Sequence, residues 1–141
     1  MQFLLPNSPQ LPVASNHYSD CSYEEIVNLN GNHWRKILII IAKLCSKQDE
    51  DWRIVRDQSI WRRATLFFTV ADLPLCDEWQ VIVGKTFYND LPIPATAREI
   101  KVGQHQAFIE NKRIWTPYLD YRQFPNALID ALREELGRNY D

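Results

Sequence analysis

The sequence predicts an α/β protein, a three-layer sandwich in which a small mixed sheet carries helices on both faces. Three observations support this class. Helical spacing of apolar residues dominates the first half, strands and helices then interleave, and the chain closes on another amphipathic segment. The loop at 72–78 is too short for a normal parallel crossover, so some antiparallel pairing is expected. The alternative is an α+β arrangement, with helices on one face of an antiparallel sheet.

Length and composition fit one globular domain over residues 1–141. The chain is 45% hydrophobic and 24% charged, which is ordinary for a globular protein. A chain of this length is expected to bury roughly two thirds of the surface that its unfolded form exposes. The sequence therefore predicts a core that needs no disulfide or metal to hold it.

Charge, cysteine use and hydropathy narrow the class of protein. The net charge of −2 disfavours general affinity for nucleic acid or anionic membranes, although a local basic patch is compatible with it. Three widely spaced cysteines, Cys21, Cys45 and Cys76, predict reduced thiols rather than a disulfide framework. No Lys or Arg precedes Arg35, and no apolar run reaches about 18 residues. We expect a cytoplasmic protein without a membrane segment, and its oligomeric state is left open.

Residues 1–20 are expected to form an extended arm. Pro6, Pro9 and Pro12 fix φ and remove backbone donors, which disfavours a helix. The segment also has four apolar residues that look like packing groups: Phe3, Leu4, Leu5 and Leu11. The arm is therefore predicted to lie packed on the surface of the domain.

Three helices are expected in the first half of the chain. A capping box begins the first helix at Ser22, and Gly31 ends it. Asn32 is then placed to cap a second helix over 33–46, which is apolar nearly all round and so predicted to be central. A less regular helix follows over 48–63.

Strand signals follow. Runs of β-branched and aromatic residues predict four strands, at 65–71, 79–83, 107–110 and 113–116. The last two strands would be joined by a tight turn at Asn111 and Lys112. Residues 86–91 are expected to form a short helix. Pro125 opens the final helix, whose predicted end is Gly137.

The first candidate for chemistry is the run Gly84-Lys85-Thr86, which follows a buried strand. It resembles the tail of a phosphate-binding P-loop, where free amides at a helix start lie beside a lysine. The glycine that the full motif requires five residues earlier is Trp79 here, which excludes a P-loop NTPase. Two interpretations stay open: a weaker anion site, or a glycine turn in which Thr86 caps the helix.

The second candidate is the aromatic and charged loop between the last strand and the last helix. Tyr118, Asp120, Tyr121 and Arg122 offer two hydroxyls, a carboxylate and a guanidinium within five residues. Ligands of open α/β sheets usually lie at the carboxyl ends of strands, where this loop falls. The structural alternative is that Asp120 and Arg122 pair locally or cap the helix, while the rings pack.

The functional hypothesis joins these two loops into one ligand site. If the strands before them are parallel neighbours, both loops emerge at the same edge of the sheet, whereas antiparallel strands would send them to opposite ends. The expected ligand is a small anion or a nucleotide-like molecule. The predicted site residues are Lys85, Thr86, Tyr118, Asp120, Tyr121 and Arg122.

Other candidates are weaker. The basic, aromatic helix start at 32–36 is of a kind that binds single-stranded nucleic acid or phosphate, but helical spacing places Trp34 on the core face. His17, His33 and His105 do not fall at metal-ligand spacing, and no metal site is predicted. No cofactor is predicted either.

Three segments carry a resemblance to known families: 31–36, 83–85 and 116–122. On these segments the chain resembles an uncharacterised bacterial family with no assigned activity. Segments 79–91 and 113–136 also resemble, in part, uracil-DNA glycosylase-like folds, where a Gly-Lys strand end and a later His-Pro-Ser loop each precede a helix. Here that loop reads Thr116-Pro117-Tyr118, and the family's early Gly-Gln-Asp-Pro-Tyr motif is absent. The likeness implies an α/β layout and no glycosylase activity.

Three function classes remain open from the sequence. The preferred class is a binding domain for a small anionic ligand, and whether the protein is an enzyme is undecided. A diverged, glycosylase-like enzyme acting on nucleic acid is the first alternative. A protein-interaction module that uses exposed aromatic residues is the second.

Overall fold

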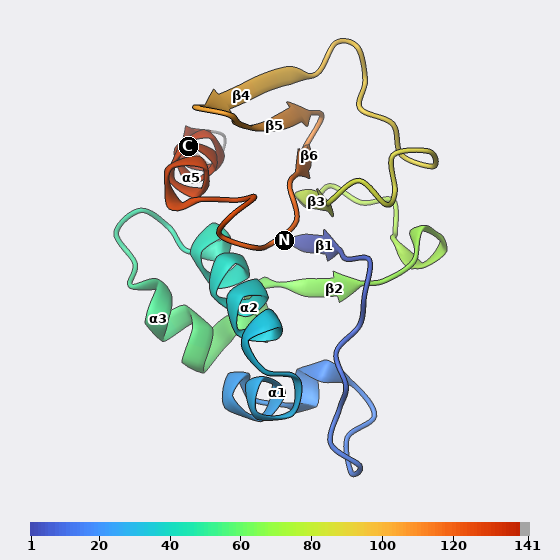
Figure 1. The fold of residues 1–141 in the computed structure, drawn as a ribbon, viewed down its shortest axis with the longest axis vertical. Helices are drawn as coiled ribbons and strands as arrows, with labels where there is room; N and C mark the ends of the chain where they lie inside the picture. Colours follow the sequence, from blue (N-terminus) through green and yellow to red (C-terminus); the bar gives the residue numbers. More distant parts are fainter. Residues whose placement is uncertain (139–141) are drawn as a thin grey trace.

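The structure is a computed structural model that describes residues 1–138, and it is built around a six-stranded mixed sheet (Figure 1). The strands are β1 (Gln2–Leu4), β2 (Thr65–Phe67), β3 (Gln80–Val83), β4 (Arg98–Val102), β5 (His105–Glu110) and β6 (Arg113–Thr116). Their order across the sheet is β2-β1-β3-β6-β5-β4. The first four strands in this order, β2, β1, β3 and β6, run parallel to one another, and β5 runs antiparallel to both of its neighbours. The predicted α/β class with a mixed sheet is confirmed.

Among the described residues, four α-helices lie within residues 23–63 and one lies at 126–138. The α-helices are α1 (Tyr23–Asn30), α2 (Asn32–Cys45), α3 (Trp52–Ile54), α4 (Ile60–Arg63) and α5 (Asn126–Arg138). A π-helical stretch over Val55–Ser59 connects α3 to α4, so the irregular third helix of the sequence is one interrupted helical segment. Within residues 1–138 no helix is both long enough and apolar enough to cross a membrane.

The start of the chain differs from the prediction, because residues 2–4 form an inner strand rather than part of a surface arm. β1 lies between β2 and β3 and pairs with both. Phe3, Leu4 and Leu5 have no exposed surface. Their alternating side chains serve both faces of the sheet, which explains why three consecutive apolar residues occur here. The irregular segment with the prolines begins only after β1.

The predicted capping box at α1 is confirmed, and the cap of α2 is corrected. Ser22 Oγ accepts a hydrogen bond from the Glu25 backbone at 3.1 Å, and the Glu25 carboxylate accepts one from the Ser22 backbone at 3.0 Å. Gly31 ends α1 at a φ of 78° and also stands at the cap position of α2. Asn32 is therefore the first residue of α2, and its side chain accepts a bond from Arg35 instead of capping the helix.

The two faces of the sheet are covered differently. α2 and α5 pack against each other over one face, where Trp34, Ile37, Ile41, Leu128 and Leu132 are buried. The other face carries Leu4, Ile82 and Trp115, which pack with Phe87 and with partly buried residues at 67–73 and 88–93. Turns and the short 3-10 helix Val70–Asp72 cover this second face.

The predicted helix over 86–91 is wrong, because this stretch forms turns. Two helical-type backbone bonds occur, Tyr88 to Lys85 and Leu91 to Phe87. The Leu91 carbonyl then accepts a bond from Trp115 Nε1 at 3.0 Å, and Pro92 follows. A side chain from β6 thus takes the carbonyl group that a longer helix would use.

Three further predictions are settled by the backbone. Asn111 and Lys112 have φ of 50° and 62°, as expected for a two-residue hairpin turn between β5 and β6. The strand predicted over 65–71 ends at Phe67. Gly137 lies within α5 and does not end it.

Candidate ligand site at the carboxyl edge of the sheet

The parallel pairing of β3 with β6 brings the two predicted loops to one edge of the sheet. The Gly84 backbone N–H donates to the Thr116 carbonyl at 3.0 Å, directly beyond the paired strands. Gly84 has a φ of 74°, and a Cβ atom on it would lie 3.7 Å from Cδ2 of Tyr118. The condition on which the functional hypothesis depended, parallel neighbouring strands, is met.

Tyr118 links three elements at this edge through its hydroxyl group. The hydroxyl donates to Asn7 Oδ1 at 2.8 Å, and it lies 2.6 Å from Nε2 of His33. Because the phenol proton goes to Asn7, the His33 bond requires a proton on Nε2. The two rings are stacked, with centroids 5.6 Å apart. The loop after β1, the start of α2 and the loop after β6 therefore meet at one phenol.

The environment of Tyr118 keeps its phenol protonated. Burial raises the pKa of Tyr118 above its usual value, the hydrogen bond to Asn7 lowers it, and the Asp120 carboxylate raises it further. A neutral phenol at physiological pH donates and accepts hydrogen bonds but does not act as a base. Tyr118 is therefore a neutral hydrogen-bonding group at this edge of the sheet.

The side chains that follow Tyr118 lie along α2. Asp120 Oδ2 is 3.8 Å from Lys36 Nζ, and Lys43 Nζ donates to the Tyr121 hydroxyl at 3.2 Å. Asp120 Oδ1 also accepts the Arg122 backbone N–H at 2.9 Å, a local turn of the kind that the structural alternative foresaw. Lys36 and Lys43 are about two turns apart on α2. These residues therefore extend away from Tyr118 over the helical layer.

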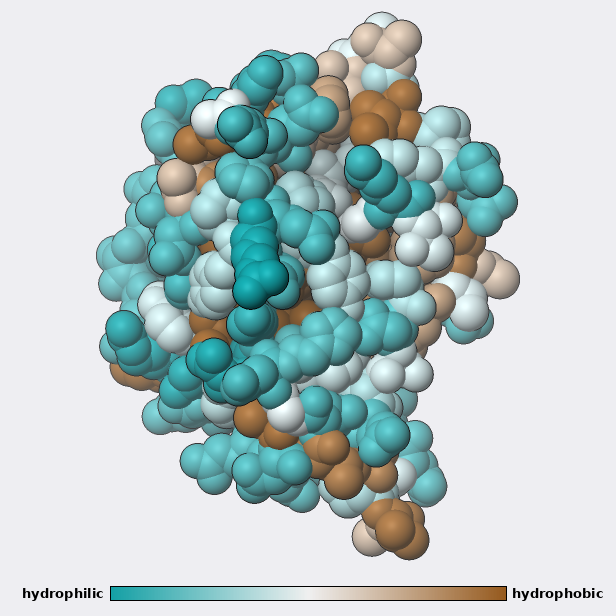
Figure 2. Space-filling model, viewed as in Figure 1, coloured by the Kyte–Doolittle hydropathy of each residue, from teal (hydrophilic) through white to brown (hydrophobic). Residues whose placement is uncertain are grey.

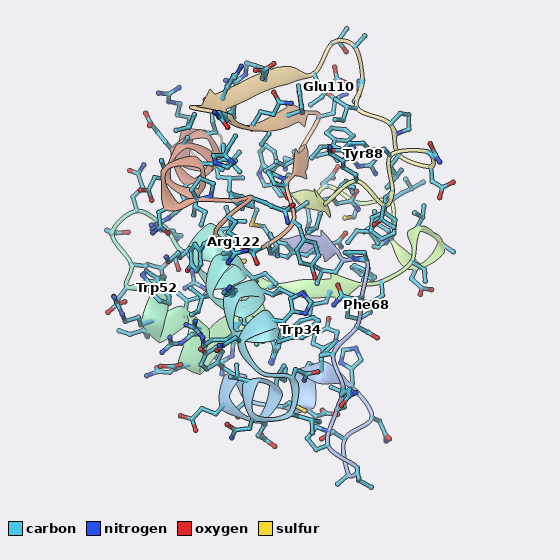
Figure 3. All side chains as sticks on the ribbon, in the orientation of Figure 1. Trp34, Trp52, Phe68, Tyr88, Glu110 and Arg122 are labelled. Carbon is cyan, nitrogen blue, oxygen red and sulfur yellow. The ribbon has the colours of Figure 1, made fainter. Side chains whose placement is uncertain are left out.

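Arg122, Lys85 and Thr86 are exposed. Figure 3 shows Arg122 over α2. Tyr88, which follows Lys85 closely in sequence, lies on the other side of the strands from Arg122 in this view. The helix start expected at Thr86 does not exist, so no helix amides contribute there.

Sequence reasoning missed two residues of this cluster, Asn7 and His33. Asn7 follows β1 closely, and recognition of residues 2–4 as a strand would have placed it at the carboxyl edge. His33 lies three residues before Lys36 on α2, so both side chains share a helical face away from the buried Trp34. The segment 32–36 was a candidate in its own right, and its histidine is the part that meets the loop.

Neither of two hollows in the surface is lined by a predicted site residue. A cavity of about 870 Å³ lies at the opposite edge of the sheet, beside the start of β1. Another hollow, of about 560 Å³, lies along β2 and the N-terminal segment that contains the prolines. The described residues contain no group of three or more His, Cys, Asp or Glu side chains arranged to hold a metal. The carboxyl edge is distinguished by its polar contacts rather than by an enclosed volume.

The face that carries α2 and the loop after β6 is mostly hydrophilic, with smaller apolar areas (Figure 2). The most exposed large apolar residues among those described are Val13, Leu29, Ile54 and Leu75, and none of them is aromatic. Such a surface favours a polar ligand over a partner that docks on exposed rings.

Comparison with known proteins identifies a family for this chain. Residues 1–137 match the model of a family of unknown function, DUF6942, and the chain belongs to that family. No curated protein and no solved structure matches the chain significantly. The resemblance to an uncharacterised family is confirmed, and the partial likeness to uracil-DNA glycosylase-like folds remains a resemblance in sequence only.

Proposed function

We propose that this protein binds a small anionic ligand at the carboxyl edge of β1, β3 and β6. One observation carries the proposal: Tyr118, held between Asn7 and His33, is seated against the Gly84 backbone at the start of the Lys85-Thr86 loop. Polar groups from the loop after β1, the start of α2 and the loop after β6 thus converge at the edge where α/β proteins bind ligands.

The side chains around this point supply charge and hydrogen bonds. Lys85 and Arg122 are exposed cations, and Arg122 has the fork geometry that suits phosphate or carboxylate. Thr86 and Tyr118 provide hydroxyl groups. Asp120 is already drawn toward Lys36, so its carboxylate repels an incoming anion less than a free one would. The six residues proposed from the sequence are kept, with Asn7 and His33 added.

The test is calorimetric titration with nucleoside monophosphates, diphosphates and inorganic phosphate. Lys85→Ala should weaken binding by about 1–3 kcal/mol, the loss expected for a hydrogen bond to a charged group. Lys101→Ala is the matched control, because Lys101 is exposed on the distant strand β4. No binding of any probe, or equal losses in both variants, would contradict the proposal.

Arg122→Ala decides how far the site extends along α2. If the ligand reaches from Tyr118 to Arg122, this variant should also lose about 1–3 kcal/mol. If only Lys85→Ala has an effect, the site ends at Tyr118, and Tyr121 and Arg122 do not belong to it.

We also propose that the protein works in the cytoplasm of a bacterial cell. All three cysteines are free thiols, as is typical of proteins in reducing compartments, and the resemblance in sequence is to a bacterial family. Fractionation of a bacterium that makes the protein should recover it with cytoplasmic enzymes. Recovery from the periplasm or the membrane would contradict this proposal.

A further inference from the structure

The cavity of about 870 Å³ at the amino edge of the sheet has the chemistry of a separate anion site. We propose that it binds a small molecule carrying phosphate groups, independently of the carboxyl-edge site. Its walls come from the last residues of α2 and α4, the segment after α2, and the C-terminal part of α5, beside Met1. It therefore lies at the opposite end of β1 from Asn7.

The lining is cationic although the whole chain is not. Five cationic side chains line the cavity: Lys47, Arg62, Arg63, Arg133 and Arg138. Only two carboxylates line it, those of Glu78 and Glu134, whereas the full chain has a net charge of −2. Like charges gathered around one hollow repel each other, and a bound anion would relieve that repulsion.

Two of the five cations already have carboxylate partners. Arg63 makes two bonds of 2.6 Å to the carboxylate of Glu50, and Arg138 bonds Glu134 at 2.7 Å. Lys47, Arg62 and Arg133 form no ion pair with any residue from 1 to 138. These three side chains are the ones that carry the proposal.

Arg133 also has an unused hydrogen-bond donor. Its Nη2 donates to the Lys47 carbonyl at 2.8 Å, but its Nε is buried and has no acceptor among the described residues. Buried donors nearly always have partners. A phosphate oxygen in the cavity would supply an acceptor when the side chain turns toward it, and guanidinium groups bind phosphate through adjacent N–H groups.

A structural role explains part of this cluster but not all of it. Arg63 Nη1 and Arg133 Nη2 donate to the carbonyls of Cys45 and Lys47, so they also complete the end of α2. The side chains of Lys47 and Arg62 make no such bond within residues 1–138 and are exposed. Arg62 complements the dipole of α4 from its last turn, and that role leaves its guanidinium N–H groups free for a ligand.

The size and the mixed lining favour a small organic phosphate over a macromolecule. The volume is in the range of small-molecule sites, about 300–1,000 Å³. Apolar side chains of Leu44 and Leu136 line it together with the cations. A ligand with an apolar body and a charged phosphate end fits both parts of the lining.

Pyrophosphate, ADP and adenosine are the probes for calorimetry and thermal unfolding of the full chain. Pyrophosphate and ADP should bind and raise the melting temperature, and adenosine should not. Sodium chloride at equal ionic strength is the control for simple screening of repulsion. The double variant Lys47→Ala/Arg62→Ala should bind about tenfold more weakly or worse, because two charged contacts are lost. Both side chains are exposed, so this variant should fold.

Further variants separate this site from the carboxyl edge. Lys101→Ala should leave pyrophosphate binding unchanged. In Lys85→Ala, which removes a cation from the carboxyl edge, pyrophosphate should still move the amide chemical shifts at 44–48 and 133–138. Equal stabilisation by sodium chloride, shifts confined to the carboxyl edge, or unchanged binding by the double variant would overturn the proposal. Tighter binding of a single-stranded RNA than of ADP would overturn the assignment to a small molecule.

Discussion

Tyr118 shows how one side chain can connect parts of the chain that lie far apart in sequence. Its hydroxyl bonds Asn7 and His33, which are 111 and 85 residues away. Its ring stacks on the His33 ring and lies against Gly84. The phenol is therefore both a candidate ligand-binding group and a structural link between the loops after β1 and β6.

Removal of that hydroxyl should have a measurable effect on stability. Tyr118→Phe keeps the ring but leaves Asn7 and His33 without their shared partner. We expect a loss of about 0.5–1.5 kcal/mol per hydrogen bond, seen as a lower urea midpoint. Tyr121→Phe is the control, because its hydroxyl has one hydrogen bond, from the half-buried Lys43 side chain. Equal midpoints for wild type and Tyr118→Phe would show that the linkage does not stabilise the fold.

Tyr118 also predicts how the stability of the fold changes at alkaline pH. Because the pKa of Tyr118 is raised in the folded state, the fold holds this proton more tightly than the unfolded chain does. Its contribution is fully present below about pH 10 and is lost as the pH rises through the folded pKa. The alkaline decline in stability should be shallower in Tyr118→Phe than in wild type.

The three thiols should react at different rates. The Cys45 sulfur lies 3.8 Å from the Arg63 carbonyl and 3.9 Å from Met1 Sδ, and burial raises the pKa of this thiol to about 12. Cys21 is buried, whereas Cys76 is exposed. A thiol reagent at pH 8 should therefore label Cys76 quickly and the other two slowly. Fast labelling of Cys45 in the folded protein would contradict this, and denaturant should make all three react.

At the scale of elements, an ion pair ties the segment between α2 and α3 to the end of α4. The Glu50 carboxylate accepts two bonds from Arg63, and these hold the pKa of Glu50 at about 2. The lowered pKa means that this contribution is present above about pH 4.3, the ordinary value for glutamate, and is lost as the pH falls toward 2. Salt should weaken it, because both side chains are partly exposed.

Glu50→Gln tests this pair. The variant should lose stability at pH 7 and show a smaller further loss between pH 4.5 and pH 2 than wild type, measured by urea unfolding at each pH. Asp49→Asn is the matched control, because Asp49 is an exposed acidic neighbour. The same acid profile in Glu50→Gln and wild type would contradict the assignment.

Helix α5 is attached to the sheet through its apolar face. Leu132 has no exposed surface and lies in the same hydrophobic cluster as residues of α2. Leu132→Ala should destabilise the protein by about 2–5 kcal/mol in denaturant unfolding. Leu75→Ala, at a leucine that is 98% exposed, makes the same chemical change and should be nearly neutral. An unchanged midpoint for Leu132→Ala would mean that α5 does not depend on this contact.

At the scale of the whole molecule, the first strand of the chain is one of the inner strands of the sheet. β1 pairs with β2 and β3, so its neighbours come from residues 65–67 and 80–82. The sheet is complete only after these distant segments have come together, so β1 depends on non-local pairing.

Phe3→Ala should therefore act as a core mutation rather than as a change in a surface arm. We expect a loss of about 3–5 kcal/mol in denaturant unfolding. Val13→Ala, in the exposed part of the N-terminal segment, should have little effect. If both variants unfold at the wild-type midpoint, β1 contributes no packing and the arm interpretation is restored.

Local signals determined much of this protein from sequence alone. The capping box at Ser22, the glycine at 31, the apolar positions of α2 and α5, and the turn at Asn111 are all specified within a few residues, so they could be predicted. The polar segments that follow β3 and β6 were also visible, because each comes directly after an apolar run.

Tertiary structure decided the features that depend on partners far away in the chain. Residues 2–4 are too few to identify a strand until two neighbours pair with them, and a bond from Trp115 helps to end the turns after Thr86. Strand direction is likewise a property of pairs, and the parallel pairing of β3 with β6 is what places Gly84 against Tyr118. The meeting of Asn7 and His33 at one phenol follows from that pairing, because hydrogen bonds between distant side chains leave no periodic pattern in the sequence.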